Sequence, residues 1–216
     1  MSINKSYAVF GLGRYGTAVA KELANSGAEV LAIDNNQAII NDVADFLPIC
    51  RCADITDPAV IEHLGISNID TVIIAMANNL EASVMATALC KEVGVKEVIA
   101  KCSNEMHKKI LLKVGADKVV FPEFESGLRL AKNLLSSGFV DVIELSKNVS
   151  MVEIDVKKEW LNKTLIELNL RKKYGLNVIA IKNDQEVIVN INPETKLNEA
   201  MKLIVIANTD KLTKLI

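Results

Sequence analysis

Short apolar runs alternate with amphipathic stretches through the first 121 residues. Six runs have the length and composition of strands: residues 7–10, 29–34, 48–52, 71–75, 97–101 and 118–121. Between them, apolar residues recur at helical spacing, and connections of this length join parallel strands. The run at 71–75 is apolar on both faces, as in a central parallel strand. The pattern therefore predicts an α/β fold with a Rossmann-like, doubly wound parallel sheet.

The pattern changes after residue 121. A helix is predicted from Glu123 to Ser137, and because no strand is predicted directly after it, we expect this helix to cross to a partner subunit. From Val149 onward, alternating residues predict a half-buried strand, and a short helix, a hairpin around Asn183-Asp184 and a last strand at 203–207 follow. We expect two domains: residues 1–138, including the crossover helix, and a smaller α+β domain at 139–216.

A glycine-rich turn, Gly11-Leu12-Gly13-Arg14-Tyr15-Gly16, lies between the first predicted strand and its helix. In such a turn the first glycine permits the bend, the second lets the backbone approach a diphosphate, and the third lets the helix pack on the strand. Asp34 ends the second strand, where a carboxylate accepts hydrogen bonds from ribose hydroxyls and repels a 2′-phosphate. This order predicts a nucleotide site; the alternative is that the glycines serve backbone geometry alone.

Composition and charge narrow the class of protein. The chain is 50% hydrophobic and has a net charge of -2, with Lys mixed among Glu and Asp, so nucleic acid is not an expected partner. No apolar window approaches the roughly 18 residues that cross a bilayer. The first residues lead directly into a strand without a signal peptide, so we expect a soluble, cytosolic protein.

The cysteines and histidines offer little for metal or acid–base chemistry. Cys50 and Cys52 share a face of one predicted strand, whereas Cys90 and Cys102 are isolated, so we expect buried, reduced thiols. His63 and His107 are the only histidines, and both fall on predicted helices. An NAD-dependent oxidoreductase, which needs an acid or base beside the nicotinamide, is therefore the weaker alternative.

Several further motifs recur in a family-specific order: Ala53-Asp54-Ile55-Thr56, Leu64-Gly65-Ile66, Gly115-Ala116-Asp117, Phe121-Pro122-Glu123 and Tyr174-Gly175. Together with the glycine turn, they make the chain resemble, over essentially its whole length, the KtrA/TrkA family of potassium-uptake regulatory subunits. Members have an RCK (regulator of potassium conductance) N-terminal domain and an RCK C-terminal domain. The resemblance implies a cytoplasmic gating subunit, not an enzyme, at the inner face of the membrane.

The resemblance also implies ligands and partners. The N-terminal domain would bind ATP or ADP, or NAD(H) as in some members of the family. Homodimers would assemble into an octameric ring beneath a separate membrane pore subunit that is KtrB/TrkH-like. A nucleotide sensor acting on a partner other than a transporter remains an alternative, because no residue identifies the partner.

The resemblance assigns roles to individual positions of the first domain. Arg14 matches the arginine that reaches the terminal phosphates, although the same residue alone would be a solvated first-turn arginine. Asp34 would bind the ribose, Asp54 would lie near the adenine, and the loop at 76–79 would line the cleft. The other implied contacts are Gly11, Gly13, Tyr15, Gly16, Asn35, Ala75, Met76, Asn78 and Lys101. Glu123 would hold a divalent cation or Na+ at the dimer interface; by itself it is only a first-turn acid.

In the second domain the resemblance implies a cyclic di-AMP site between two copies. The matching positions are Leu165, Ile166, Arg171, Leu176, Asn177, Val178 and Pro193. Arg171 can pair with phosphate, Asn177 can bond a phosphate or base edge, and the aliphatic residues can sandwich adenine. The alternative is a core face plus an exposed basic turn at 171–173. Phe124-Glu125-Ser126 differs from the family, in which more polar residues are usual at these positions. The difference concerns the geometry of the cation site at the adjacent Glu123.

Overall fold

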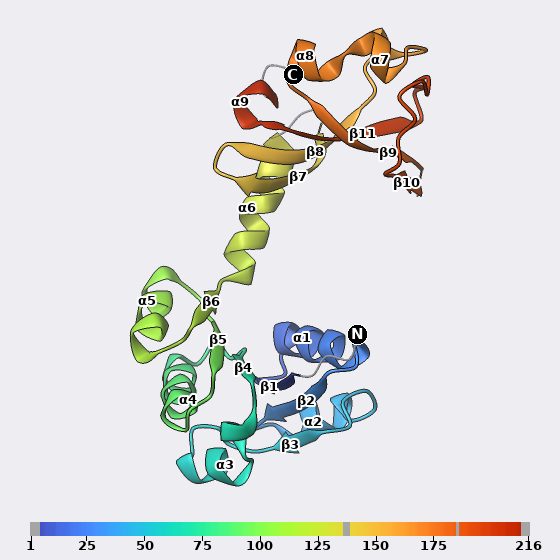
Figure 1. Ribbon diagram of the computed structural model, residues 1–216. Helices are drawn as coiled ribbons and strands as arrows, with labels where there is room; N and C mark the ends of the chain where they lie inside the picture. Colours follow the sequence, from blue (N-terminus) through green and yellow to red (C-terminus); the bar gives the residue numbers. More distant parts are fainter. Residues whose placement is uncertain (1–4, 136–138, 185, 213–216) are drawn as a thin grey trace. The chain divides into compact units, whose positions relative to one another are not determined.

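The predicted apolar runs of the first part of the chain form one parallel sheet (Figure 1). The computed structural model describes residues 5–135, 139–184 and 186–212, and it divides into two units, Met1–Pro122 and Glu123–Ile216. The strands are β1 (Ser6–Phe10), β2 (Glu29–Asp34), β3 (Cys50–Cys52), β4 (Thr71–Ile74), β5 (Glu97–Lys101) and β6 (Lys118–Val120). Their order, β3-β2-β1-β4-β5-β6, is that of a doubly wound Rossmann sheet, which confirms the predicted fold class.

Four helices of this unit begin where a short polar side chain caps them. They are α1 (Arg14–Asn25), α2 (Gln37–Val43), α3 (Pro58–His63), the 3-10 turn η1 (Ile66–Asn68), α4 (Leu80–Glu92) and α5 (Glu105–Val114). Asn36, Asp57, Asn79 and Asn104 each accept a hydrogen bond from a first-turn N–H of the helix that follows. Helix α1 follows Gly13 and has no side-chain cap. The first N–H groups of a helix have no partner within the helix, and here no cap side chain binds them.

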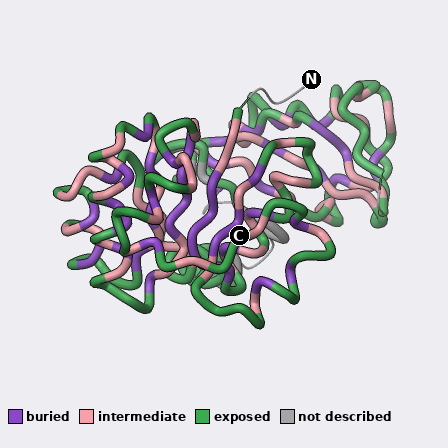
Figure 2. The backbone as a smooth tube through the Cα atoms, turned by 90° about the horizontal axis from the view of Figure 1, so that it is seen from below, coloured by how far each residue is buried: buried purple, intermediate pink, exposed green. Residues whose placement is uncertain are grey.

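The sheet separates two cores. Val9 and Ile73 project to the face covered by α1 and α2, where they pack with Ala20 and Ile40. Phe10 projects to the opposite face, together with Ala8 of the same strand and with Val72 and Ile74 of β4. Helices α3, α4 and α5 pack on this face. The resulting alternation of buried and exposed stretches can be followed in Figure 2. Burial on both faces explains why these strands read as continuous apolar runs.

The second unit contains an antiparallel sheet. Its elements are α6 (Pro122–Leu135), β7 (Phe139–Ser146), β8 (Val149–Asp155), the 3-10 turn η2 (Lys158–Trp160), α7 (Leu165–Leu168), α8 (Leu170–Tyr174), β9 (Asn177–Asn183), β10 (Glu186–Ile188), β11 (Met201–Asn208) and α9 (Thr209–Leu212). The strand order is β10-β9-β11-β8-β7. Trp160, Leu176 and Leu203 lie in its core. The domain boundary predicted after residue 138 adjoins residues 136–138, which are outside the described ranges, and stays a prediction.

Two elements of the second unit depart from the sequence interpretation. We expected no strand directly after the helix now seen as α6, but β7 occupies residues 139–146. Its pairing with β8 shifts register between Phe139 and Val142 and again between Glu144 and Ser146, and such irregular pairing is not marked by a strict period of two in the sequence. Helix α8 was also missed, because five residues are too few for a helical period.

Helix length and polarity bear on membrane crossing. Within the described ranges, every helix is too short or too polar to span a bilayer.

Asp70 joins three segments of the first unit just before β4. One carboxylate oxygen accepts hydrogen bonds from the backbone N–H and the hydroxyl of Ser6, at 3.1 and 3.2 Å, and the other lies 2.7 Å from Lys96 Nζ. Because Lys96 and Ser6 donate to the charged carboxylate, they lower the pKa of Asp70 from 3.8 to about 2.

We expect Asp70→Asn to lower the free energy of unfolding at pH 7. Since the folded pKa of Asp70 is depressed, its contribution is present above its ordinary pKa and is lost as the pH falls through about 2. The difference between wild type and variant should therefore shrink below about pH 4, as measured by urea unfolding across pH. Asp42→Asn, which removes the same charge from an exposed position of α2, is the control. A difference that stays constant over this pH range would contradict the prediction.

Candidate functional site

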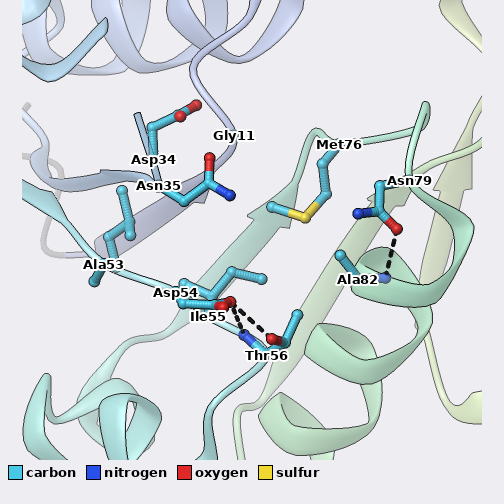
Figure 3. A pocket seen from close by; sticks show the side chains of 11 residues that line it. Gly11, Asp34, Asn35, Ala53, Asp54, Ile55, Thr56, Met76, Asn79 and Ala82 are labelled. Carbon is cyan, nitrogen blue, oxygen red and sulfur yellow. Dashed lines mark hydrogen bonds between the residues drawn. The ribbon is translucent and has the colours of Figure 1, made fainter. Parts of the chain in front are cut away.

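A pocket of about 260 Å³ opens at the carboxyl ends of β1 to β4 in the first unit (Figure 3). The strand order reverses between β1 and β4, and ligands of open α/β sheets bind at such a switch point. Gly11 lies at the end of β1, Asp34 ends β2, Ala53 follows β3 and Met76 follows β4. The pocket volume is slightly below the range for small-molecule sites, which begins at roughly 300 Å³.

The glycine turn brings α1 very close to the end of β1. Gly11 has φ of +88°, a conformation that other residues rarely adopt, and its N–H donates to Ile33 O at 2.8 Å. A Cβ at Gly16 would overlap the carbonyl oxygen of Gly11 and would lie 3.1 Å from Ala75 Cβ. A Cβ at Gly13, by contrast, would have no heavy atom within 4 Å. Gly16 is therefore required by packing, whereas the space at Gly13 is open.

Asp34 is held in position by the same turn. One carboxylate oxygen accepts the Leu12 N–H at 2.7 Å and the other accepts the Asn36 N–H at 2.9 Å. A carboxylate has about four acceptor positions, so these two bonds leave capacity for two further donors. The hydroxyls of a ribose are donors of this kind. Asp34 thus both orders the glycine turn and retains acceptors for a ligand.

Polar groups on the β3 and β4 side of the pocket are also ordered. Asp54 accepts from the hydroxyl and the backbone N–H of Thr56, at 2.7 and 3.0 Å, and these bonds lower the pKa of Asp54. Asn79 accepts the Ala82 N–H at 3.0 Å. Figure 3 shows the Met76 side chain extending between these groups. The pocket therefore combines an apolar surface with acceptors fixed by local hydrogen bonds.

Cationic side chains lie beside the first turn of α1. Arg14 is the first residue of this helix and is exposed. Lys101 ends β5 and places its Nζ 5.5 Å from the centre of the Tyr15 ring, a cation–π distance. Negative charge is stabilised at a helix N-terminus, so this end of the site suits phosphates.

The predicted residues of the first site fall into two groups. Gly11, Asp34, Asn35, Asp54 and Met76 line the pocket. Gly13, Arg14, Tyr15, Gly16, Ala75, Asn78 and Lys101 do not line it, although several belong to the turn or the α1 end beside it. Their contact with a ligand stays a prediction.

Asn79 belongs to the 76–79 loop that we expect to line the cleft, and it lines the pocket. The sequence did not single out five other lining residues: Ile33, Ala53, Ile55, Thr56 and Ala82. The motif at 53–56 was a usable signal for three of them. Of the two asparagines in this loop, Asn79 caps α4 and lines the pocket, whereas Asn78 does not line it.

Glu123 lies in the first turn of α6 and is exposed. Among the described residues, no group of three or more His, Cys, Asp or Glu is arranged to hold a metal ion. The cation role of Glu123 between two copies stays a prediction.

A second hollow, of about 410 Å³, lies in the second unit where β8 and β9 begin and β11 ends. Arg171 and Asn177 line it, as does Lys211, which the sequence did not single out. The other predicted positions do not line it: Leu176 is fully buried, Leu165 and Val178 are half-buried, and Ile166 and Pro193 are exposed. Their roles stay predictions.

The thiols and histidines differ partly from expectation. Cys90 and Cys102 are buried, and burial raises the pKa of Cys90 to about 12. Cys52, however, is exposed, because the short edge strand β3 has no neighbour beyond it. His107 is buried, with Nε2 2.7 Å from Ser83 Oγ, and burial lowers its pKa. A histidine enclosed between α4 and α5 is poorly placed to serve a bound nicotinamide.

Comparison with known sequences gives matches over nearly the whole chain. Residues 7–122 match the family model of the TrkA-N domain, and residues 149–216 match that of the TrkA-C domain. The chain is 37% identical over 212 residues to Ktr system potassium uptake protein C of Bacillus subtilis (strain 168), covering 98% of this chain and 96% of that protein. It is 35% identical over 209 residues to Ktr system potassium uptake protein A of Vibrio alginolyticus, covering 97% and 95%.

Solved structures share the fold at low identity. The GsuK channel bound to NAD has a TM-score of 0.65 at 17% identity, covering 100% of this chain and 40% of the solved chain. GsuK bound to ADP has a TM-score of 0.52 at 23% identity, covering 61% and 34%. The chain therefore spans less than half of each of these solved chains.

We expect the two glycines of the turn to respond differently to alanine. Gly16→Ala should lower the free energy of unfolding by about 1–3 kcal/mol or more, because its Cβ overlaps the Gly11 carbonyl. Gly13→Ala should change it by about 1 kcal/mol or less, since the weaker helix cap is offset by reduced unfolded-state entropy. Urea unfolding of both variants tests this, and equal losses would contradict it.

Proposed function

The chain belongs to the TrkA family, with a TrkA-N domain followed by a TrkA-C domain, and on this basis we propose that it is the nucleotide-controlled regulatory subunit of a Ktr/Trk-type potassium transporter. Its pore is a separate membrane protein, and the subunit acts on that pore from the cytoplasmic side. The observation that carries the proposal is the pocket at the β1–β4 switch point, lined by Gly11 and Asp34, in a chain whose relatives are potassium uptake proteins.

The ligand proposed for this pocket is an adenine nucleotide, ATP or ADP, with NAD(H) as the alternative. The free acceptor capacity of Asp34 suits ribose hydroxyls, and the uncapped start of α1 suits phosphates. Asp54, charged and ordered by Thr56, can accept from an exocyclic amine. The same fold has been solved with NAD and with ADP in GsuK, which supports the ligand class.

Arg14 is proposed to distinguish ATP from ADP. It stands at the first position of α1, so a fixed cation there can add one charge-assisted contact to a terminal phosphate. Such a contact contributes roughly 1.5–3 kcal/mol. A divalent cation or Na+, held with Glu123 between two copies, would neutralise the remaining phosphate charge.

Helix α6 is proposed to join two copies. Phe124, Leu128, Leu130 and Leu134 are 47% to 76% exposed in the single chain. At 100° per residue they fall on one broad side of the helix, with Arg129 on the other. An exposed apolar helix of this kind needs a partner, and the resemblance to RCK proteins supports a homodimer that assembles further into an octameric ring.

Gating follows from differential binding. Shifting a two-state pore from 1:99 to 99:1 requires roughly 5.5 kcal/mol of preference for one state, and several equivalent sites in a ring can share it. A nucleotide that bound both ring shapes equally would gate nothing. The role of the nucleotide is therefore that of a signal and not of a substrate.

The second unit is proposed to bind cyclic di-AMP between two copies. Arg171 and Asn177 face the same hollow, where they can hold a phosphate and a base edge. Ile166 is exposed next to the α7 cap at Thr164, so it can stack on adenine contributed to the interface. This gives the protein two independent ligand sites.

We expect Asp34→Ala to abolish binding of ATP, ADP and NADH while leaving binding of cyclic di-AMP nearly intact, and Arg171→Ala to do the reverse. The reason is that the two residues belong to separate pockets in separate units. Calorimetric titration of the full chain measures this. Because Asp34 also orders Leu12, Gly13→Ala serves as a second variant that blocks phosphate approach without that loss. Loss of both ligands in a variant that remains folded would refute two independent sites.

We also expect Leu128→Glu to shift the protein from dimers and larger assemblies toward monomers, because it places a charge on the apolar side of α6. Arg129→Gln changes the net charge equally on the other side of the helix and is the control. Sedimentation velocity measures the distribution. A wild-type monomer, or a Leu128→Glu variant that assembles like wild type, would rule out α6 as the dimer contact.

A further inference from the structure

A lysine side chain lines the hollow of the second unit, and the resemblance to the KtrA/TrkA family assigns it no role. Lys211 lies on α9 and lines the hollow together with Arg171 from α8. No aspartate or glutamate is among the described residues that line it. Two positive side chains facing one concave surface without a carboxylate favour an anion.

The path of the Lys211 side chain depends on Gly175. This glycine ends α8 with φ of +71° and ψ of 23°, and a Cβ placed on it would lie 2.6 Å from Lys211 Cδ and 2.9 Å from Lys211 Nζ. The lysine stem therefore crosses directly over the glycine. A side chain at this position would make the end of the Lys211 side chain shift, and glycine is also the residue best suited to the positive φ.

The elements that carry these residues are held together by the core and the sheet. Leu212, next to Lys211, is buried, and Leu170 at the start of α8 is buried in the same cluster. Asn208 pairs with Val149, and Ile206 pairs with Asn177, whose Nδ2 donates to Ile206 O at 3.5 Å. The register of β11 between β8 and β9 thus brings α9 to the hollow.

We propose that Lys211 is a second phosphate-binding residue of this hollow, positioned across Gly175 to share a phosphodiester anion with Arg171. The inference rests on the proposed cyclic dinucleotide site and adds a residue to it. Arg171 can bind phosphate through its planar fork, whereas Lys211 contributes a mobile point charge. Each ligand phosphate then meets one cation from α8 and one from α9, so ligand binding fastens the terminal helix to the rest of the unit.

The test is calorimetric titration of the full chain with cyclic di-AMP at several salt concentrations. Lys211→Gln should weaken binding about tenfold and flatten the salt dependence, because it removes one charge-assisted contact. Lys211→Arg should keep the affinity near wild type. Lys172→Gln removes the same charge from an exposed residue of α8 that does not line the hollow, and it should leave the affinity unchanged.

Gly175→Ala completes a double-mutant cycle. It should weaken binding in the wild-type background by displacing the Lys211 stem, but should have little effect in the Lys211→Gln background. Any strain at the positive φ is common to both backgrounds and cancels. This coupling would not arise if Lys211 only stabilised α9.

The outcomes separate the inference from the function it rests on. If wild type binds cyclic di-AMP and Lys211→Gln binds equally well, the role of Lys211 is refuted while the site stands. If wild type does not bind cyclic di-AMP, both the cyclic dinucleotide site and the role of Lys211 are refuted. ATP titration of the same samples reports on the first unit and should be unaffected by any of these variants.

Discussion

The close approach of Gly16 to the carbonyl oxygen of Gly11 is the constraint on which the first unit depends. It places the start of α1 directly at the end of β1, where the N–H of Leu12 can meet the carboxylate of Asp34. The Thr17 hydroxyl donates a hydrogen bond to Leu12 O at 2.7 Å. Both the N–H and the carbonyl of Leu12 are therefore bonded to side chains. Because of the contact between Gly16 and Gly11, α1 begins directly beside the sheet edge at which β1 and β2 end.

The two hollows have opposite electrostatic character. The first is lined by the carboxylates of Asp34 and Asp54, which lie at the ends of β2 and β3. The cation Lys101 lies outside it, beside Tyr15 in the first turn of α1. The second is lined by cations from α8 and α9 and by amides. The sugar of a nucleotide carries hydroxyl donors, which suit the carboxylates of the first hollow, and its phosphates suit the α1 end beside it. The cations of the second hollow suit a compact phosphodiester. The two hollows therefore differ in the chemistry of the ligands that they favour.

The surfaces left exposed are consistent with a protein that works as an assembly. The apolar residues of α6 and the exposed Ile166 would be unfavourable on a solitary chain, since large apolar patches on monomers are uncommon. By contrast, the core of each unit is complete without the other, because Phe10 and Ile33 are enclosed in the first and Trp160 and Leu203 in the second. The stability of each unit therefore comes from its own core.

The sequence by itself determined the parallel sheet, the glycine turn and the place of Asp34, because each depends on local spacing: strand periodicity, positive φ at Gly11 and a carboxylate at a strand end. It did not reveal β7, whose pairing with β8 shifts register twice, nor which residues of the predicted 76–79 loop line the pocket, namely Met76 and Asn79. The juxtaposition of Lys211 with Arg171 was decided only by the tertiary structure, since it arises from the register of β11 between β8 and β9 and from a glycine whose missing side chain matters only once another segment crosses it.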